Sequence, residues 1–526
     1  MVRSEGGIFS LTRADARSGS RYCYVFGDGR ARPDPASRRQ PEGVHAPSQI
    51  FDPGAFKWSD RSWKGLPLES LIIYELHVGT FTSEGTLDAA ARRLEDLADL
   101  GVSCVELMPV QPFAGQRNWG YDGVLPYAVH EGYGGPEALQ RFVDAAHRIG
   151  LAVCLDVVYN HFGPEGNYLR EFGPYFSSRH RSPWGDGINY DGPGSNQVRR
   201  FAIDAALQWV RDFHLDALRL DAIHAIADDS PRHIVAELAE EVRRFASSAD
   251  RRVHVIAESD LNSRVIVDPP PKGWGLAAMW ADDFHHAIHT LLTQERARFY
   301  ADFGKPEHLV RALTRGFTYQ GEHSTFRGRA HGTDTEGLAP SRFVFCLQNH
   351  DQVGNRPRGE RISSLVPHEA LPAMAATLLL GPGLPLLFMG EDYGETRPFL
   401  YFTSHSDPDL ARAVSEGRKK EFISTATQDI PDPQDPSTFE RSKLTHRRDG
   451  RHGALRETYR QLLALRRRYQ ACIAAEWPRV RADGRRFLLE RSEFDLEVNL
   501  GPESSGDLPG WAWKVSLRSG QRSGRA

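Results

Sequence analysis

Short apolar runs alternate with amphipathic stretches along most of the chain, beginning at Leu71. Each run is seven or eight residues long and mostly apolar, as expected for a parallel strand buried on both faces. The stretches between the runs repeat apolar side chains at helical spacing, as in residues 86–100. This alternation predicts an α/β fold, a (β/α)8 or TIM barrel. The eight runs are 71–78, 102–108, 152–158, 216–222, 254–260, 277–283, 342–349 and 384–390.

The rest of the chain has a different pattern on either side of this region. Residues 1–66 are rich in Gly, Pro, Ser and Arg and contain short strand-like pieces. The barrel is expected to span 67–470, with a long Gly/Pro/aromatic loop at 162–194 and its eighth helix near 455–469. Residues 471–526 indicate a small C-terminal β domain whose last eight residues are disordered. An open doubly wound sheet is disfavoured, because no Gly-rich phosphate loop follows the first strand.

Composition excludes several classes of protein. Charged residues make up 25% of the chain and the formal net charge is −4, so nucleic acid is not an expected partner. The five cysteines are scattered without a CxxC pair, which argues against a zinc site or a disulfide framework and favours the cytoplasm. The N-terminus lacks the apolar core of a signal peptide. Residues 370–390 are nearly all apolar, but their prolines and glycines predict a helix, a turn and a strand in the core, and no membrane partner is expected.

Carboxylates stand at or near the ends of seven of the predicted strands. In a barrel of this type the carboxyl ends of the strands converge on one rim, where the active site lies. Gathering so many acids there costs free energy that packing does not explain, so we expect a functional site. The acids are Glu106, Asp156, Asp221, Glu258, Asp282 with Asp283, Asp351 and Glu391.

Two of these acids have surroundings that suit glycoside hydrolysis, which needs one ionised and one protonated carboxyl group. Arg219 and Asp221 are two residues apart on one strand and share a face, so the guanidinium should keep Asp221 ionised as a nucleophile. Glu258 follows the apolar run HVIA, whose desolvation should hold a proton on it for donation. The structural alternative is an ordinary Arg–Asp bridge and an exposed glutamate.

Four motifs resemble the four sequence regions of the α-amylase superfamily of glycoside hydrolases: DVVYNH (156–161), RLDAIH (219–224), Glu258 within IAESD, and NHD (349–351). The resemblance implies Asp221 as nucleophile, Glu258 as acid/base and Asp351 as a third acid that binds sugar hydroxyls. It further implies that His161 and His350 contact the same sugar, that Asp156 supports them, and that Tyr121 is the stacking platform. His224 is equally compatible with a core position. Trp119, Trp184 and Tyr190 are compatible with either the cleft or plain packing.

Longer stretches, such as NWGYDGVLPYAVHEGYGG (118–135) and LQNHDQVGNRPRGER (347–361), resemble the trehalose-releasing subgroup of that superfamily. The resemblance implies a retaining glycosidase that cuts the α-1,4 bond next to the terminal trehalose of malto-oligosyltrehalose. It implies no cofactor and no metal, and a malto-oligosyltrehalose synthase acting beforehand. Asp282, Asp283, His286 and Arg356 are expected to recognise the trehalose end or, alternatively, to brace the rim. Only the later part of the subgroup's N-terminal β-sandwich is recognisable, within residues 1–66, so exposed strand edges are expected there.

Two other functions remain open at this stage. The first is a glycogen branching or debranching enzyme, which shares the barrel and its acids. The second is a catalytically silent barrel that only binds glucan, although such proteins lose one or more of the three acids and this chain keeps all of them.

Overall fold

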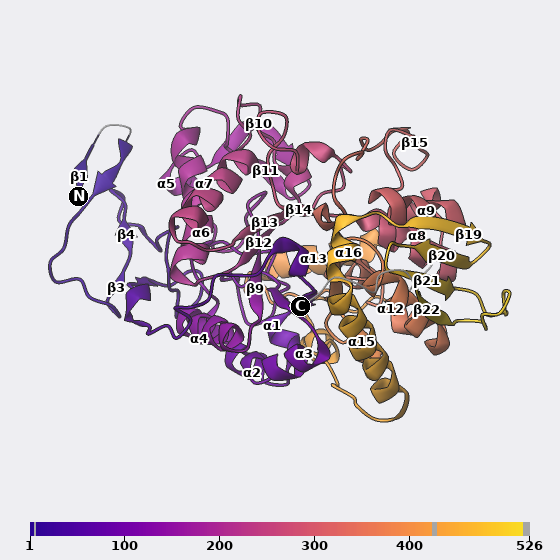
Figure 1. Cartoon of the computed structure of the whole chain (residues 1–526). Helices are drawn as coiled ribbons and strands as arrows, with labels where there is room; N and C mark the ends of the chain where they lie inside the picture. Colours follow the sequence, from indigo (N-terminus) through magenta and orange to yellow (C-terminus); the bar gives the residue numbers. More distant parts are fainter. Residues whose placement is uncertain (5–6, 423–428, 519–526) are drawn as a thin grey trace.

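The fold is built around a closed barrel of parallel strands, seen near the centre of Figure 1. The computed structural model describes residues 1–4, 7–422 and 429–518. All eight predicted strands are present, which confirms the barrel. They are β7 (Ile73–Leu76), β8 (Cys104–Leu107), β9 (Ala152–Val157), β12 (Ala217–Leu220), β13 (His254–Ala257), β14 (Ala278–Trp280), β17 (Phe343–Cys346) and β18 (Leu384–Phe388).

The period-two alternation of each strand separates an inner from an outer layer. Cys104, Cys154 and Ala217 belong to one buried apolar cluster inside the barrel, whereas their strand neighbours pack outward against the helices. Residues two positions further along each strand therefore also face inward. This places Glu106, Asp156 and Arg219 in the barrel interior, where each is at most 1% exposed.

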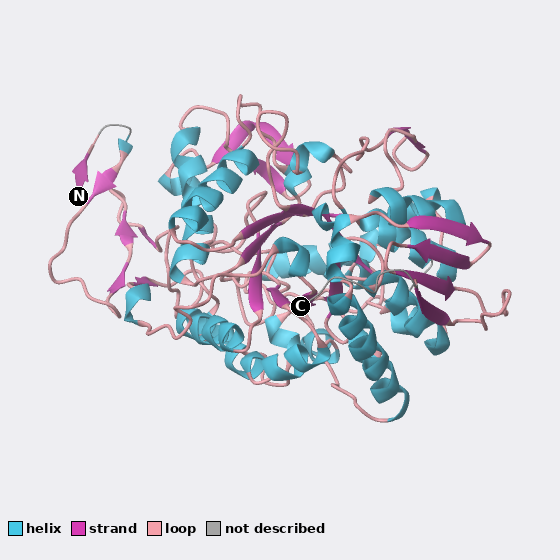
Figure 2. Ribbon diagram, viewed as in Figure 1, coloured by secondary structure: helices cyan, strands magenta, loops and turns pink. Residues whose placement is uncertain are grey.

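Most of the predicted crossover helices are present (Figure 2). The helix predicted at 86–100 is interrupted between α2 (Leu87–Ala91) and α3 (Leu94–Leu100), and Gly101 ends α3 at φ 113°. The connection from β13 to β14 has only the short 3-10 turn Arg264–Ile266 in place of a helix. Three consecutive prolines follow that turn at 269–271, and prolines cannot supply helical N–H donors. The other crossover helices are α4 (Gly135–Arg148), α6 (Ser195–Asp212), α7 (Ile234–Ser248), α8 (Asp282–Thr293), α9 (Pro306–Arg315), α12 (Leu371–Leu379) and α15 (Gly450–Arg468).

The apolar segment 370–390 forms helix α12, a turn and strand β18, all buried, as predicted. Among the described residues, no helix is both long and apolar enough to cross a membrane. The long loop at 162–194 contains more structure than predicted. Helix α5 (Leu169–Phe172) and a hairpin of β10 (Phe176–Ser182) with β11 (Gly185–Ile188) lie within it.

The two flanking regions differ in how their strands pair. Residues 1–66 contain three separate two-stranded sheets, and the described part of this region forms no packed sandwich. Val2, Phe9 and Val25 are each at least 59% exposed there, in agreement with the expected exposed edges. The C-terminal β domain is an antiparallel sheet of four strands: β19 (Arg479–Asp483), β20 (Arg486–Glu490), β21 (Phe494–Asn499) and β22 (Trp513–Leu517). The predicted disorder of the last eight residues lies outside the described part of the chain.

Candidate active site

A cavity of about 1310 Å³ opens at the carboxyl ends of the barrel strands. Its lining includes most of the residues that the sequence singled out, contributed by loops from almost every strand. They are Tyr121, His161, Asp221, His224, Glu258, Asp282, His286, His350, Asp351 and Arg356. Asp156 and Arg219 lie beneath these residues in the barrel.

Arg219 joins three of the acids. Its Nη1 donates to both carboxylate oxygens of Asp156, at 2.9 and 2.8 Å, and to Oδ1 of Asp221 at 2.8 Å. Its Nη2 lies 3.7 Å from Oε2 of Glu258. Asp221 and Glu258 thus contact the two terminal nitrogens of one buried guanidinium. Both carboxyl groups line the same cavity.

Glu258 is expected to carry a proton. Burial raises its pKa well above the usual value, Arg219 opposes this shift, and the nearby Asp221 adds to it. Asp221 has different surroundings, because it accepts hydrogen bonds from Arg219 and from Nδ2 of Asn160, at 2.9 Å. The two carboxyl groups therefore differ in the way that general-acid catalysis with a separate nucleophile requires.

His350 lies at the centre of a second buried group. Its Nδ1 is 2.5 Å from Oε1 of Glu75 and its Nε2 is 2.7 Å from the Tyr121 hydroxyl, which donates to Asp156 at 2.6 Å. Burial disfavours the charged imidazole, but the carboxylates of Asp351 and Glu75 raise the pKa of His350 to about 9. Both ring nitrogens are therefore hydrogen-bond donors at neutral pH.

His161 and Asn160 form the wall beside strand β9. Nδ1 of His161 is 2.6 Å from the amide oxygen of Asn160, so both ends of the Asn160 amide are engaged, one by His161 and the other by Asp221. The exposed Trp184 of the hairpin stacks on His161, with ring centroids 4.7 Å apart. His224, whose position the sequence left open, is exposed at the cavity and not part of the core.

The residues after strand β14 divide into two groups. Asp282 and His286 line the cavity, and burial, followed by the charge of Asp351, raises the pKa of Asp282 to about 7. Asp283 does not line it. Its carboxylate accepts hydrogen bonds from Asn262 Nδ2 and from the backbone N–H groups of Thr318 and Tyr319. For Asp283 the geometry favours the bracing alternative.

Arg356 presents its guanidinium at the cavity, held by Glu295 at 2.9 Å. Glu295 is in turn 3.0 Å from Nε2 of His289 on helix α8. Sequence reasoning did not identify Glu295, nor the pairing of Glu75 with His350. It also missed several aromatic residues of the cavity lining, among them Phe299 and Phe326. Glu295 and Phe326 lie in loops and Phe299 in a short 3-10 helix, so no strand or motif spacing marks them. Glu75 lies on strand β7, but its partner His350 is 275 positions away in the sequence.

Two strand-end acids that the sequence grouped with the site lie away from the cavity. Glu391 accepts a hydrogen bond from Tyr459 at 3.2 Å, and burial raises its pKa to about 8. Glu106 is completely buried inside the barrel, where burial and the charges of Glu75 and Asp156 raise its pKa to about 8.

Two aromatic residues that the sequence assigned to either the cleft or the core can now be placed. Trp119 packs on Phe399 at the edge of the cavity. Tyr190 is core, with its hydroxyl on the carbonyl of Tyr159.

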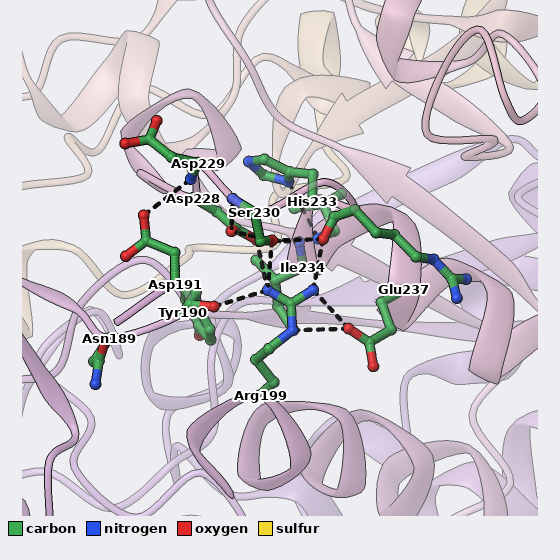
Figure 3. A network of polar contacts seen from close by, with 12 residues as sticks. Asn189, Tyr190, Asp191, Arg199, Asp228, Asp229, Ser230, His233, Ile234 and Glu237 are labelled. Carbon is green, nitrogen blue, oxygen red and sulfur yellow. Dashed lines mark hydrogen bonds and ion pairs between the residues drawn. The ribbon is translucent and has the colours of Figure 1, made fainter. Parts of the chain in front are cut away.

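An arginine network fixes the loops that form one side of the cleft (Figure 3). Arg199, on helix α6, donates to the Tyr190 carbonyl at 2.9 Å, to Asp228 at 2.7 Å and to Glu237 at 2.6 Å. It thereby joins the end of the hairpin loop to the loop after strand β12. Nearby, one ring nitrogen of His180 and one carboxylate oxygen each of Asp191 and Asp229 lie within 4.8 Å of one another. Arg179 pairs with Asp229 at 2.8 Å, which balances part of the negative charge.

Comparison with known proteins shows the family to which the chain belongs. The family model described as "Alpha amylase, catalytic domain" matches residues 49–184. A curated relative from Rhizobium sp. (strain M-11), named malto-oligosyltrehalose trehalohydrolase, is 50% identical over 87% of this chain and 78% of its own. The chain belongs to the malto-oligosyltrehalose trehalohydrolase family. Members of this family are glycosidases related to the α-amylases, so the chain is an enzyme.

Two further comparisons bear on the fold and on the alternative function. A crystal structure of a protein from Salmonella typhimurium superposes with a TM-score of 0.92 at 42% identity, covering 98% of this chain and 93% of that one. A 1,4-alpha-glucan branching enzyme from Bacillus cereus (strain B4264) is 32% identical over only 42% of this chain and 37% of its own. The likeness to the trehalohydrolase family therefore outweighs the branching-enzyme alternative.

Proposed function

We propose that this enzyme hydrolyses the α-1,4-glucosidic bond next to the terminal trehalose unit of malto-oligosyltrehalose and releases trehalose with retained configuration. The observation that carries the proposal is the arrangement at Arg219, which donates a hydrogen bond to Asp221 and lies beside Glu258, whose pKa is raised by burial. The names of the relatives support the substrate class.

The reaction follows from these two carboxyl groups. Asp221 attacks the anomeric carbon while Glu258 gives its proton to the departing glycosidic oxygen, so a glycosyl ester forms and trehalose leaves. Glu258, now ionised, then takes a proton from water, whose oxygen attacks the same carbon and releases Asp221. A pair of carboxyl groups roughly 5–5.5 Å apart is typical of this retaining route.

The remaining cavity residues bind the sugar. His350, His161 and Asp351 line the place of the sugar that is attacked, and the Tyr121 ring supplies a flat apolar face. We assign recognition of the trehalose end to Asp282, His286 and Arg356, with His224 beside them. We further propose that a malto-oligosyltrehalose synthase makes the substrate, because the α,α-1,1 link must be in place before this bond is cut.

Product analysis tests the proposal. Wild-type enzyme incubated with malto-oligosyltrehalose should release trehalose. The newly formed reducing end of the glucan product should appear first as the α-anomer, because configuration is retained. Glu258→Gln should lower kcat by several orders of magnitude, because acid assistance to a poor leaving group is lost. Glu84→Gln, at an exposed carboxylate, is the matched control and should behave like wild type.

Other outcomes would refute it. New or lost α-1,6 branches in a glucan would make the protein a branching or debranching enzyme. Tight binding of malto-oligosyltrehalose without turnover would make it a silent glucan-binding barrel.

A further inference from the structure

Ala222, the residue after the proposed nucleophile, has a left-handed backbone conformation. Its φ is 38° and its ψ is 50°, in a region that residues other than glycine, asparagine and aspartate seldom occupy. The side chain is buried at the floor of the cavity. Such a conformation costs free energy and persists only where the surrounding structure enforces it.

The turn directs two successive backbone amides onto Glu258. The N–H of Ala222 donates to Oε2 of the Glu258 side chain at 2.5 Å, and the N–H of Ile223 donates to the Glu258 carbonyl at 3.1 Å. Strands β12 and β13 pair Leu220 with Ala257, so Asp221 and Glu258 follow their strands side by side. The left-handed residue turns the chain from one carboxyl group toward the other.

This contact makes the two oxygens of Glu258 different. Oε2 accepts the Ala222 N–H and lies 3.7 Å from Nη2 of Arg219, so both neighbours favour an oxygen without a proton. Within the described residues no hydrogen bond reaches Oε1. Glu258 lines the cavity, so its other oxygen is available to substrate.

We propose that the Ala222 amide is a positioning donor that fixes the proton of Glu258 on Oε1 and stabilises the carboxylate left after proton transfer. The inference rests on the proposed function of Glu258 as acid/base. As the bond between the anomeric carbon and the glycosidic oxygen breaks, that oxygen keeps the bonding electron pair and takes the proton from Oε1, while the electrons of the O–H bond stay on Glu258. The negative charge that appears on Glu258 is then shared by Oε2, where the Ala222 N–H makes a stronger, charge-assisted hydrogen bond.

The sharpest test removes this one N–H. Replacing Ala222 by L-lactic acid through nonsense suppression turns the amide into an ester and keeps the methyl side chain. The matched control is the same replacement at Ala225, whose N–H donates to the carbonyl of Ala222 at 2.9 Å, within the same turn. On malto-oligosyltrehalose we expect kcat to fall roughly 10- to 100-fold for the 222 ester, the size of a hydrogen bond to a charged group. The 225 ester should keep a kcat close to that of wild type, because its lost hydrogen bond joins two neutral backbone groups and does not reach Glu258.

A substrate with an activated leaving group distinguishes the loss of proton donation by Glu258 from a loss of active-site structure. A maltosyl fluoride carries a leaving group that needs little protonation, so the 222 ester should lose much less activity on it than on malto-oligosyltrehalose. The alkaline limb of kcat/KM should move to higher pH, since the lost hydrogen bond favours ionised Glu258. Equal losses on both substrates, or a 222 ester indistinguishable from the 225 ester, would overturn the inference.

Two further variants keep the result interpretable. Ala222→Gly retains the N–H and removes the steric cost of a positive φ, so its Tm should equal or exceed that of wild type; a marked fall would contradict an enforced conformation. Full activity in Glu258→Gln would refute the proposed function itself. An inactive Glu258→Gln together with a fully active 222 ester would refute only the role of Ala222.

Discussion

Buried ion pairs and burial itself shift the pKa values of the titratable residues at the active site. Arg219 is shared by Asp156, Asp221 and Glu258, and His350 is paired with Glu75 and Asp351. These cations are fully buried, so each acts on its acids with little screening by water. The same dry interior raises the pKa of Glu258, which is next to a cation but is itself desolvated.

Glu75→Gln tests the charge balance around His350. The pKa of His350 is raised to about 9 from an ordinary value near 6.5, by Asp351 and Glu75 against the effect of burial. This pairing stabilises the fold fully below pH 6.5 and is lost as pH rises through 9. We therefore expect Glu75→Gln to lower Tm strongly at pH 6 and much less at pH 9.5. Thermal denaturation across this range checks the prediction, and a Tm difference that does not change with pH would contradict it.

The secondary-structure elements determine which side chains reach the cavity. Residues two apart on a strand share the barrel interior, so Arg219 and Asp221 act on the same site. The loops need separate anchors, and Arg199 provides one by joining the hairpin loop to the loop after β12. Because Trp184 lies on that hairpin and stacks on His161, the anchor also shapes the sugar-binding wall.

Arg199→Met should loosen this wall. The Asp228 side chain is fully buried and would keep only its hydrogen bonds from Ser230 and from the Ile234 N–H, so losing the arginine should cost about 1–3 kcal/mol. We expect a lower Tm and a higher KM for malto-oligosyltrehalose, with kcat less affected. Arg200→Met is the matched control: its pair with Asp204 is exposed and should contribute less than about 1 kcal/mol. Equal effects in the two variants would show that the network is not an anchor.

At the scale of the whole molecule, the barrel is closed at the end opposite the cavity by the segment before the first strand. Trp63, Leu66 and Leu68 pack against the apolar cluster inside the barrel. His147 of helix α4 ties this segment down, with Nδ1 at 2.8 Å from Asp60 and Nε2 at 2.9 Å from Asp216. This contact joins the segment before the barrel to two of its crossover connections.

His147→Gln should destabilise the fold without changing the chemistry at the rim. Burial opposes the charged imidazole, but hydrogen bonds to Asp216 and Asp60 raise the pKa of His147 above its usual value. Its contribution is therefore complete below about pH 6.5 and declines as pH rises through the folded-state pKa. We expect the largest fall in Tm at pH 6 and a smaller one at pH 9, with KM unchanged at 25 °C. A raised KM would indicate that the closed end of the barrel communicates with the cavity.

The sequence by itself determined the barrel and the proposed catalytic acids. Both follow from short-range regularities: apolar strands of fixed period, and a carboxylate at or near the end of seven of the eight strands. Asp221, Glu258 and His350 stand in motifs on those strands, so their meeting at one rim follows from closure of the barrel. Family motifs added His161 and Tyr121, which the structure also brings to the cavity.

Only the tertiary structure decided which nearby groups pair with one another. The contact of Glu75 with His350 joins residues 275 positions apart, and Asp283 turned out to hold neighbouring backbone instead of lining the cavity. The positive φ of Ala222 is likewise invisible in an ordinary Asp-Ala-Ile sequence. Local patterns fix the direction of a side chain along a strand, whereas hydrogen-bond partners depend on register and loop packing between distant segments.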